Sequence, residues 1–71
     1  MNELALTLNG EPVRVDARST IADLVRALVE GDEPRGVAVA VDRCVVPRSE
    51  WASTAVRAGS SVEVVSAAAG G

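Results

Sequence analysis

Alternating apolar and polar residues open the chain and predict a β-hairpin. In residues 3–8 leucine occupies every second position, and Val13 and Val15 resume the alternation further on. Strict alternation places one set of side chains on a buried face and the other set in solvent. Between the two runs stands Asn9-Gly10, a pair that tolerates the positive φ angles of a tight hairpin turn. We therefore expect two antiparallel strands within residues 3–16.

The next segment changes to a helical spacing. One apolar stripe recurs at i, i+3, i+4 and i+7, formed by Ile21, Leu24, Val25 and Leu28. Thr20 suits the N-cap position, and Asp23 three residues later can return a hydrogen bond to it. Gly31 is placed to end the helix in a left-handed conformation. A helix of about ten residues cannot bury such a stripe alone, so it must pack on a sheet.

Two more strands are expected after a polar loop at residues 31–36. Residues 37–42 carry valine on one face and only alanine on the other, which is typical of a strand flanked on both sides. The run Cys44-Val45-Val46 predicts a short or edge strand, because Pro47 cannot donate to a strand ladder.

The final third of the chain predicts a short helical turn and a last strand. Ser49 is expected to cap one turn over residues 50–52, and residues 57–61 read as a turn. The strand over residues 61–65 would place Val62 and Val64 inward. The predicted order is strand, strand, helix, strand, short strand, turn, strand.

Composition restricts the classes of function. The 71 residues suffice for one small domain, and the single aromatic residue, Trp51, leaves a core of aliphatic side chains. We expect Trp51 to close that core rather than to anchor a partner. A net charge of −3 without a basic run argues against nucleic acid as a partner. One cysteine and no histidine argue against a metal site, and we expect no signal peptide, no membrane span and a cytoplasmic location.

The C-terminal residues are the candidate functional segment. Gly70-Gly71 follows the last predicted strand and an alanine spacer, residues 67–69. Because glycine lacks a Cβ, such an end is thin enough to enter a narrow channel and bring its carboxylate to an enzyme. The alternative is an ordinary frayed terminus. The sequence offers no Ser-His-Asp set, no Cys-His pair and no glycine-rich phosphate loop, so we expect no catalytic residues.

The element order resembles the β-grasp, or ubiquitin-like, fold, and the sequence is similar to the ThiS family of sulfur carriers for thiazole formation in thiamine biosynthesis. The resemblance rests on the turn Asn9-Gly10, the helix start at residues 20–24, the stretch from Val45 to Trp51, and the end Ala69-Gly70-Gly71. It implies an α+β domain over residues 1–66, with a mixed four- to five-stranded sheet and one main helix on one face. Residues 67–71 would form a flexible tail.

The resemblance also implies a function. The Gly71 carboxylate would be adenylated by an E1-like, ThiF-like adenylyltransferase that uses ATP and Mg²⁺. A persulfide would then supply sulfur, and the thiocarboxylate at Gly71 would serve a ThiG-like thiazole synthase. Gly70 and Ala69 would thread the partner's channel, and the chain itself would bind no cofactor. The spacer departs from the family, whose members often carry larger aliphatic residues where this chain has Ala67 and Ala68.

Several alternatives remain open from the sequence. The chain could be a related thiocarboxylate carrier, either the small subunit of molybdopterin synthase or a carrier for cysteine synthesis. It could be a modifier attached to lysine residues of other proteins, or an interaction module with an inert tail. Cys44 is expected to be a small structural residue rather than a sulfur-handling one, and Arg48 a solvated charge. The loop residues Asp32 and Glu33 could steer a basic partner or simply be solvated.

Overall fold

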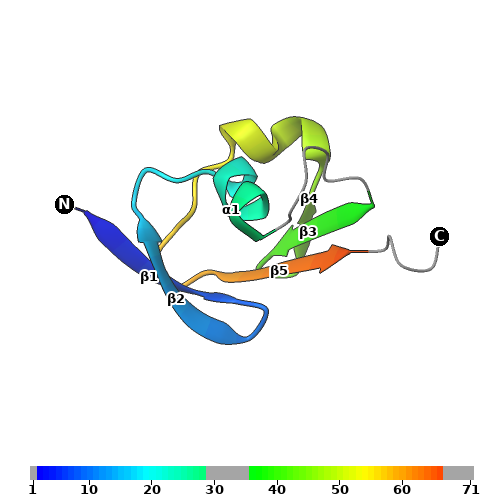
Figure 1. Cartoon of the computed structure of the whole chain (residues 1–71). Helices are drawn as coiled ribbons and strands as arrows, with labels where there is room; N and C mark the ends of the chain where they lie inside the picture. The colour runs from blue at the N-terminus through cyan, green and yellow to red at the C-terminus, as the bar shows by residue number, and fades with distance from the viewer. Residues whose placement is uncertain (1, 29–35, 67–71) are drawn as a thin grey trace.

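A computed structural model of the chain describes residues 2–28 and 36–66 (Figure 1). Its elements follow in the order β1 (Glu3–Leu8), β2 (Glu11–Asp16), α1 (Ile21–Leu28), β3 (Val37–Val41), β4 (Cys44–Val46), the 3₁₀ helix η1 (Arg48–Ser53) and β5 (Ser61–Ser66). The order predicted from apolar spacing is therefore confirmed, and each strand lies within a residue or two of its expected bounds.

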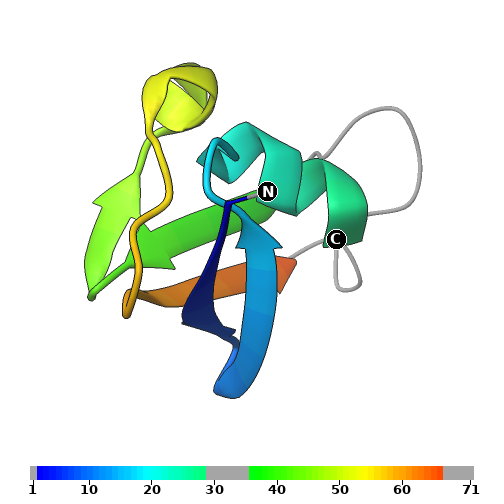
Figure 2. The ribbon, with the colours of Figure 1, turned by 90° about the vertical axis from the view of Figure 1, so that its left-hand side faces the viewer.

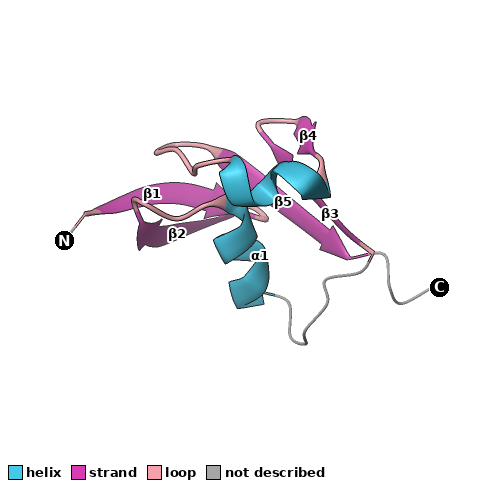
Figure 3. Cartoon of the chain, turned by 90° about the horizontal axis from the view of Figure 1, so that it is seen from above, coloured by secondary structure: helices cyan, strands magenta, loops and turns pink. Residues whose placement is uncertain are grey.

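The strands form one mixed sheet with the order β2-β1-β5-β3-β4. Strand β5 lies in the middle, parallel to β1 and antiparallel to β3, whereas the other two pairs are antiparallel hairpins. Both helices lie on the same face of this sheet (Figures 1 and 2), and Figure 3 shows them from above. The expected α+β architecture is confirmed. The short strand β4 lies at an edge, as the proline after it predicted.

Two tight turns made by residues in left-handed conformations connect the hairpins. Asn9 and Gly10 join β1 to β2 with φ angles of 53° and 85°. Asp42 and Arg43 join β3 to β4 with φ angles of 49° and 73°. Two consecutive positive φ angles are characteristic of the hairpin turn whose twist matches the strands. The Asn9-Gly10 turn expected from the sequence is confirmed.

Asp42 also fastens the beginning of the central strand. Its main-chain N–H donates to the carbonyl oxygen of Ser61 at 2.8 Å. Its side-chain Oδ1 accepts a hydrogen bond from the N–H of Ser61 at 2.9 Å. A single turn residue thus occupies both main-chain groups of the first residue of β5.

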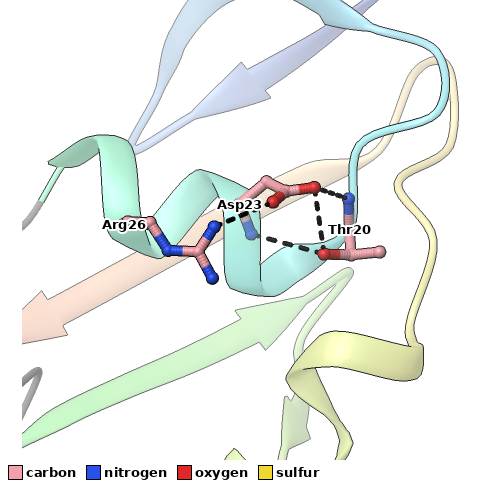
Figure 4. A network of polar contacts seen from close by, with 3 residues as sticks. All are labelled: Thr20, Asp23 and Arg26. Carbon is pink, nitrogen blue, oxygen red and sulfur yellow. Dashed lines mark hydrogen bonds and ion pairs between the residues drawn. The ribbon is translucent and has the colours of Figure 1, made fainter.

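Helix α1 begins with a reciprocal pair of hydrogen bonds (Figure 4). The N–H of Thr20 donates to Asp23 Oδ2 at 2.9 Å, and the N–H of Asp23 donates to Thr20 Oγ1 at 3.3 Å. Each side chain satisfies a main-chain donor that the first turn of a helix leaves free. Arg26 Nη1 lies 3.3 Å from Asp23 Oδ1 on the same exposed surface. The N-cap and its partner expected from the sequence are confirmed.

Aliphatic side chains from α1 and the sheet build the core. The buried apolar residues are Leu6, Ile21, Leu24, Val25, Val39, Trp51, Val56 and Val62. Three of the four stripe residues of α1 are among them, but Leu28 is 44% exposed. The stripe is therefore shorter than its spacing predicted, because the apolar period does not tell how far covering elements extend along the helix. Gly31, the expected helix end, lies outside the described residues.

Trp51 packs inside the protein and is tied to the backbone. The side chain is only 5% exposed, and its Nε1 donates a hydrogen bond to the carbonyl oxygen of Val46 at 2.9 Å. This bond satisfies the polar end of the ring, so that the rest of it can be buried. The packing interpretation of Trp51 is confirmed.

The expected cap of the short helical turn was wrong. Helix η1 starts at Arg48, with Pro47 as its N-cap and no side-chain capping bond. Ser49 lies inside the turn. Proline fixes its own φ near the value needed before a helix, here −59°, so that the turn can begin without a side-chain oxygen.

Trp51→Phe separates the packing of this ring from its hydrogen bond. The variant is expected to be less stable by about 1–2 kcal/mol, because most of the apolar area remains while the donor to Val46 is lost. Trp51→Ala should cost about 3–5 kcal/mol. Urea unfolding followed by far-UV circular dichroism measures both. Equal losses for the two variants would contradict the packing role.

Asp23→Asn tests the start of α1 through pH. The main-chain N–H of Thr20, the Thr20 hydroxyl and, least, Arg26 lower the pKa of Asp23 below its ordinary value of 3.8, while partial desolvation opposes them. A pKa lowered by folding adds stability that is present above pH 3.8 and is lost as the pH falls through the folded-state value. The wild type should therefore exceed Asp23→Asn in stability at neutral pH.

The advantage of the wild type should shrink as the pH falls below 3.8. Urea unfolding at a series of pH values measures it. Arg26→Gln is the matched control and should keep most of the pH dependence, because the bonds from Thr20 are the larger causes. A difference between wild type and Asp23→Asn that does not vary with pH would refute this account.

Candidate functional site

The central strand leads directly into the C-terminal segment that the sequence marks as functional. β5 ends at Ser66, immediately before the alanine spacer. On one side β5 pairs with β1 at Thr7 and Leu8, and on the other it pairs with β3 from Val62 to Ser66. Strands thus hold the beginning of β5 on both edges, whereas its last residues pair with β3, and this pairing fixes where the C-terminal segment begins.

The approach to β5 is also held by the first strand. The N–H of Gly59 donates to the carbonyl oxygen of Ala5 at 2.8 Å, and the N–H of Thr7 donates to that of Ser60 at 2.9 Å. Gly59 has a φ of 80°, which glycine adopts without a steric penalty. The turn before β5 thus enters the sheet beside β1 and continues as its parallel neighbour.

Asn9 binds β5 beyond the point where β1 ends. Its main-chain N–H donates to the carbonyl oxygen of Val62 at 2.8 Å, and its Oδ1 accepts from the N–H of Val64 at 2.8 Å. The sequence identified Asn9 only as a turn residue. An asparagine in a turn has a free side-chain amide, but only the fold shows that β5 lies next to it.

The two faces of β5 differ sharply. Val62 is buried and Val64 half-buried beneath the helices, as the alternation predicted. Val65 faces the uncovered side of the sheet and is 60% exposed. It pairs with the exposed Ala38 of β3, and Val45 of the neighbouring edge strand is 74% exposed. We call Ala38, Val45 and Val65 the open-face patch. Ala38 and Val65 are paired next to the end of β5, and Val45 lies on the edge strand opposite Ala40.

The predicted site residues Ala69, Gly70 and Gly71 lie outside the described residues. The same is true of the expected tail, residues 67–71, and of the loop residues Asp32 and Glu33. The structure therefore bears on the base of this segment, at β5, and not on the segment itself. The roles expected of Ala69, Gly70 and Gly71 stay predictions.

Two other residues considered from the sequence are placed by the structure. Cys44 is a free, exposed cysteine at the start of edge strand β4. It is not part of the buried core, and its expected structural role stays a prediction. Arg48 is exposed at the start of η1, in agreement with a solvated charge.

The described residues hold no group of three histidine, cysteine, aspartate or glutamate side chains that could bind a metal ion. A shallow hollow lined by Asn2, Glu3, Asp16 and Arg18 lies at the far end of the β1–β2 hairpin. Because β1 and β5 are parallel, this hollow is at the opposite end of the sheet from Ser66. Within residues 2–28 and 36–66, no helix reaches the length and apolar character needed to cross a bilayer.

Comparisons with known proteins agree with the geometry. The ThiS family model matches residues 6–71. Among solved structures, the chain is similar to the crystal structure of a thiamine biosynthesis protein (ThiS) from Geobacter metallireducens, with 30% sequence identity and a TM-score of 0.75. The similarity covers 96% of this chain and 100% of the other. No curated protein matches the sequence.

These findings settle the fold and the family. The five-stranded mixed sheet with one main helix on one face is the β-grasp arrangement, and the ThiS neighbour shares it over nearly its full length. The family match begins in β1 and runs through every later element described above. The chain belongs to the ThiS family.

Proposed function

We propose that this protein is a sulfur carrier in thiamine biosynthesis, and that Gly71 carries the sulfur as a C-terminal thiocarboxylate. The observation that carries the proposal is family membership over residues 6–71, together with a central strand that ends at Ser66, directly before the spacer and Gly70-Gly71. In this proposal the folded domain has no catalytic task. It presents one reactive carboxylate to enzymes that supply the chemistry.

The proposed chemistry begins with activation, because a carboxylate is a poor electrophile. An oxygen of the Gly71 carboxylate attacks the α-phosphate of ATP on an E1-like adenylyltransferase, and pyrophosphate leaves. The terminal sulfur of a persulfide then attacks the acyl carbon, and AMP leaves. A second thiol reduces the resulting disulfide and frees the thiocarboxylate, which donates its sulfur on a thiazole synthase. We expect ATP and Mg²⁺ to be bound by the adenylyltransferase and not by this chain, and this stays a prediction.

The shape of the domain suits this role at the base of the C-terminal segment. Activation requires the partner to enclose the terminal carboxylate, so it must approach the end of β5. There it meets the open-face patch, in which Val65 lies next to the end of β5 and exposes apolar surface that the helices do not cover. Apolar side chains beside the start of the C-terminal segment offer the partner contact area, and they contain no nucleophile that could compete with the carboxylate.

Related carriers remain the nearest alternative. A carrier for molybdopterin or cysteine synthesis would share the fold and the activation step, but the ThiS family match favours thiazole formation. The two kinds of carrier are distinguished by testing whether thiazole synthase takes sulfur from the thiocarboxylate form of this protein. An interaction module would still bind its partner after removal of Gly70 and Gly71, whereas a carrier would lose all acceptor activity. The cytoplasmic location stays a prediction.

The direct test is intact mass. With the adenylyltransferase, ATP, Mg²⁺ and a persulfide source, the mass should rise by the difference between one sulfur and one oxygen atom. The mass before reaction also shows whether the native chain ends at Gly71. An unchanged mass, under conditions that convert a known carrier, would count decisively against the proposal, as would a native chain that continues past this residue.

Gly71→Ala tests the need for a thin end. The added methyl group displaces the carboxylate within a narrow site, and a displacement of about 1 Å can cost about a hundredfold in rate. We expect a loss of this order in adenylation, measured by pyrophosphate release, with an unchanged circular dichroism spectrum and melting temperature. Conversion at the wild-type rate would show that glycine is not required there.

A further inference from the structure

Strand β5 extends further than its neighbour β1. The parallel pairing ends at Leu8 and Val62, whereas β5 stays paired with β3 as far as Ser66. After Leu8 the backbone turns away into the hairpin, since Asn9 has a φ of 53°. Among the described strands, none pairs with residues 63–66 on this side of β5.

Asn9 fills the first position on this open side. Its main-chain N–H bonds to Val62 and its Oδ1 accepts the N–H of Val64, each at 2.8 Å. The side-chain amide therefore continues the pairing by one step after β1 has ended. Main-chain groups alternate between the two edges of a strand, so the N–H of Val65 faces β3 instead.

The turn conformation alone does not require asparagine. Glycine adopts a left-handed φ at the lowest steric cost, but it would leave the N–H of Val64 without this acceptor. Aspartate tolerates the same φ and keeps an acceptor oxygen. Asn9 thus has two separable tasks, one in the turn and one on β5.

We infer that Asn9 is a positioning residue for activation of the C-terminal carboxylate. By binding Val64, it keeps the last residues of β5 paired with β3, so that the chain after Ser66 starts from one place. This inference rests on the proposed function, which makes the position of that start relevant to a reaction. A loosened strand end must be ordered again when the partner binds, which raises KM, whereas kcat in the bound state changes little.

The structure supplies a matched control for this test. Asp42, like Asn9, has a left-handed conformation and bonds to β5 through its N–H and a side-chain oxygen. Its partner is Ser61, at the opposite end of the strand from the C-terminal segment. The experiment therefore compares Asn9→Gly with Asp42→Gly, and uses Asn9→Asp as the rescue variant.

Asn9→Gly is expected to raise the KM for adenylation about fivefold, the factor that one ordinary hydrogen bond gives in an equilibrium, with kcat near the wild-type value. Amide hydrogen exchange, followed by NMR, should be faster at Val65, whose neighbour Val64 is the residue bonded to Asn9 Oδ1. The exchange rates are compared after allowing for each variant's free energy of unfolding. Asn9→Asp and Asp42→Gly should keep the wild-type KM and the wild-type exchange at Val65.

The inference is wrong if Asn9→Gly leaves both KM and Val65 exchange unchanged, or if Asp42→Gly raises KM as strongly. Failure of the proposed function looks different, because the wild type itself would not be adenylated. In that case the exchange rate at Val65 alone decides whether Asn9 holds the end of β5.

Discussion

Pairing of β5 on both edges is the constraint on which the rest of the structure depends. The strand is the last in sequence but the middle one in space, so the sheet is complete only when the C-terminal part of the chain has joined it. Turn residues from both hairpins bond to it, Asp42 at Ser61 and Asn9 at Val62 and Val64. The segment that follows β5 is therefore attached to the middle strand of the sheet rather than to an edge.

The core achieves this support with aliphatic side chains and a single aromatic ring. The most deeply buried residues are Ile21, Val25, Val39 and Val62, which are aliphatic and have few rotamers to lose on folding. Trp51 is the one large side chain, and its bond to Val46 joins η1 to the edge strand. In a domain of this size a few kcal/mol decide whether the chain folds, so this single ring has a large effect on stability.

Features set by neighbours in sequence could be predicted, and features set by distant segments could not. The Asn9-Gly10 turn and the Thr20–Asp23 pair depend on residues a few positions apart, so both could be predicted from the local sequence. The exposure of Leu28 depends on what lies beside the helix. The start of η1 is a local exception, because Pro47 and Ser49 are close in sequence and either residue could precede the turn. The bond from Asn9 to Val64 joins residues 55 positions apart, and no local pattern indicates it.

Separation of a rigid body from a reactive end follows from the chemistry of a carrier. If the carboxylate must enter the active sites of two different enzymes in turn, the carrier cannot hold it in a rigid cleft of its own. Both enzymes can instead use a C-terminal segment that starts from a fixed place on the carrier and is narrow and long enough to reach their nucleotide or substrate. A central strand provides the first, and the spacer with Gly70-Gly71 provides the second in the function proposed above. The residues that matter for such a protein are then those that hold the last strand, and Asn9 reaches further along it than any other turn residue described.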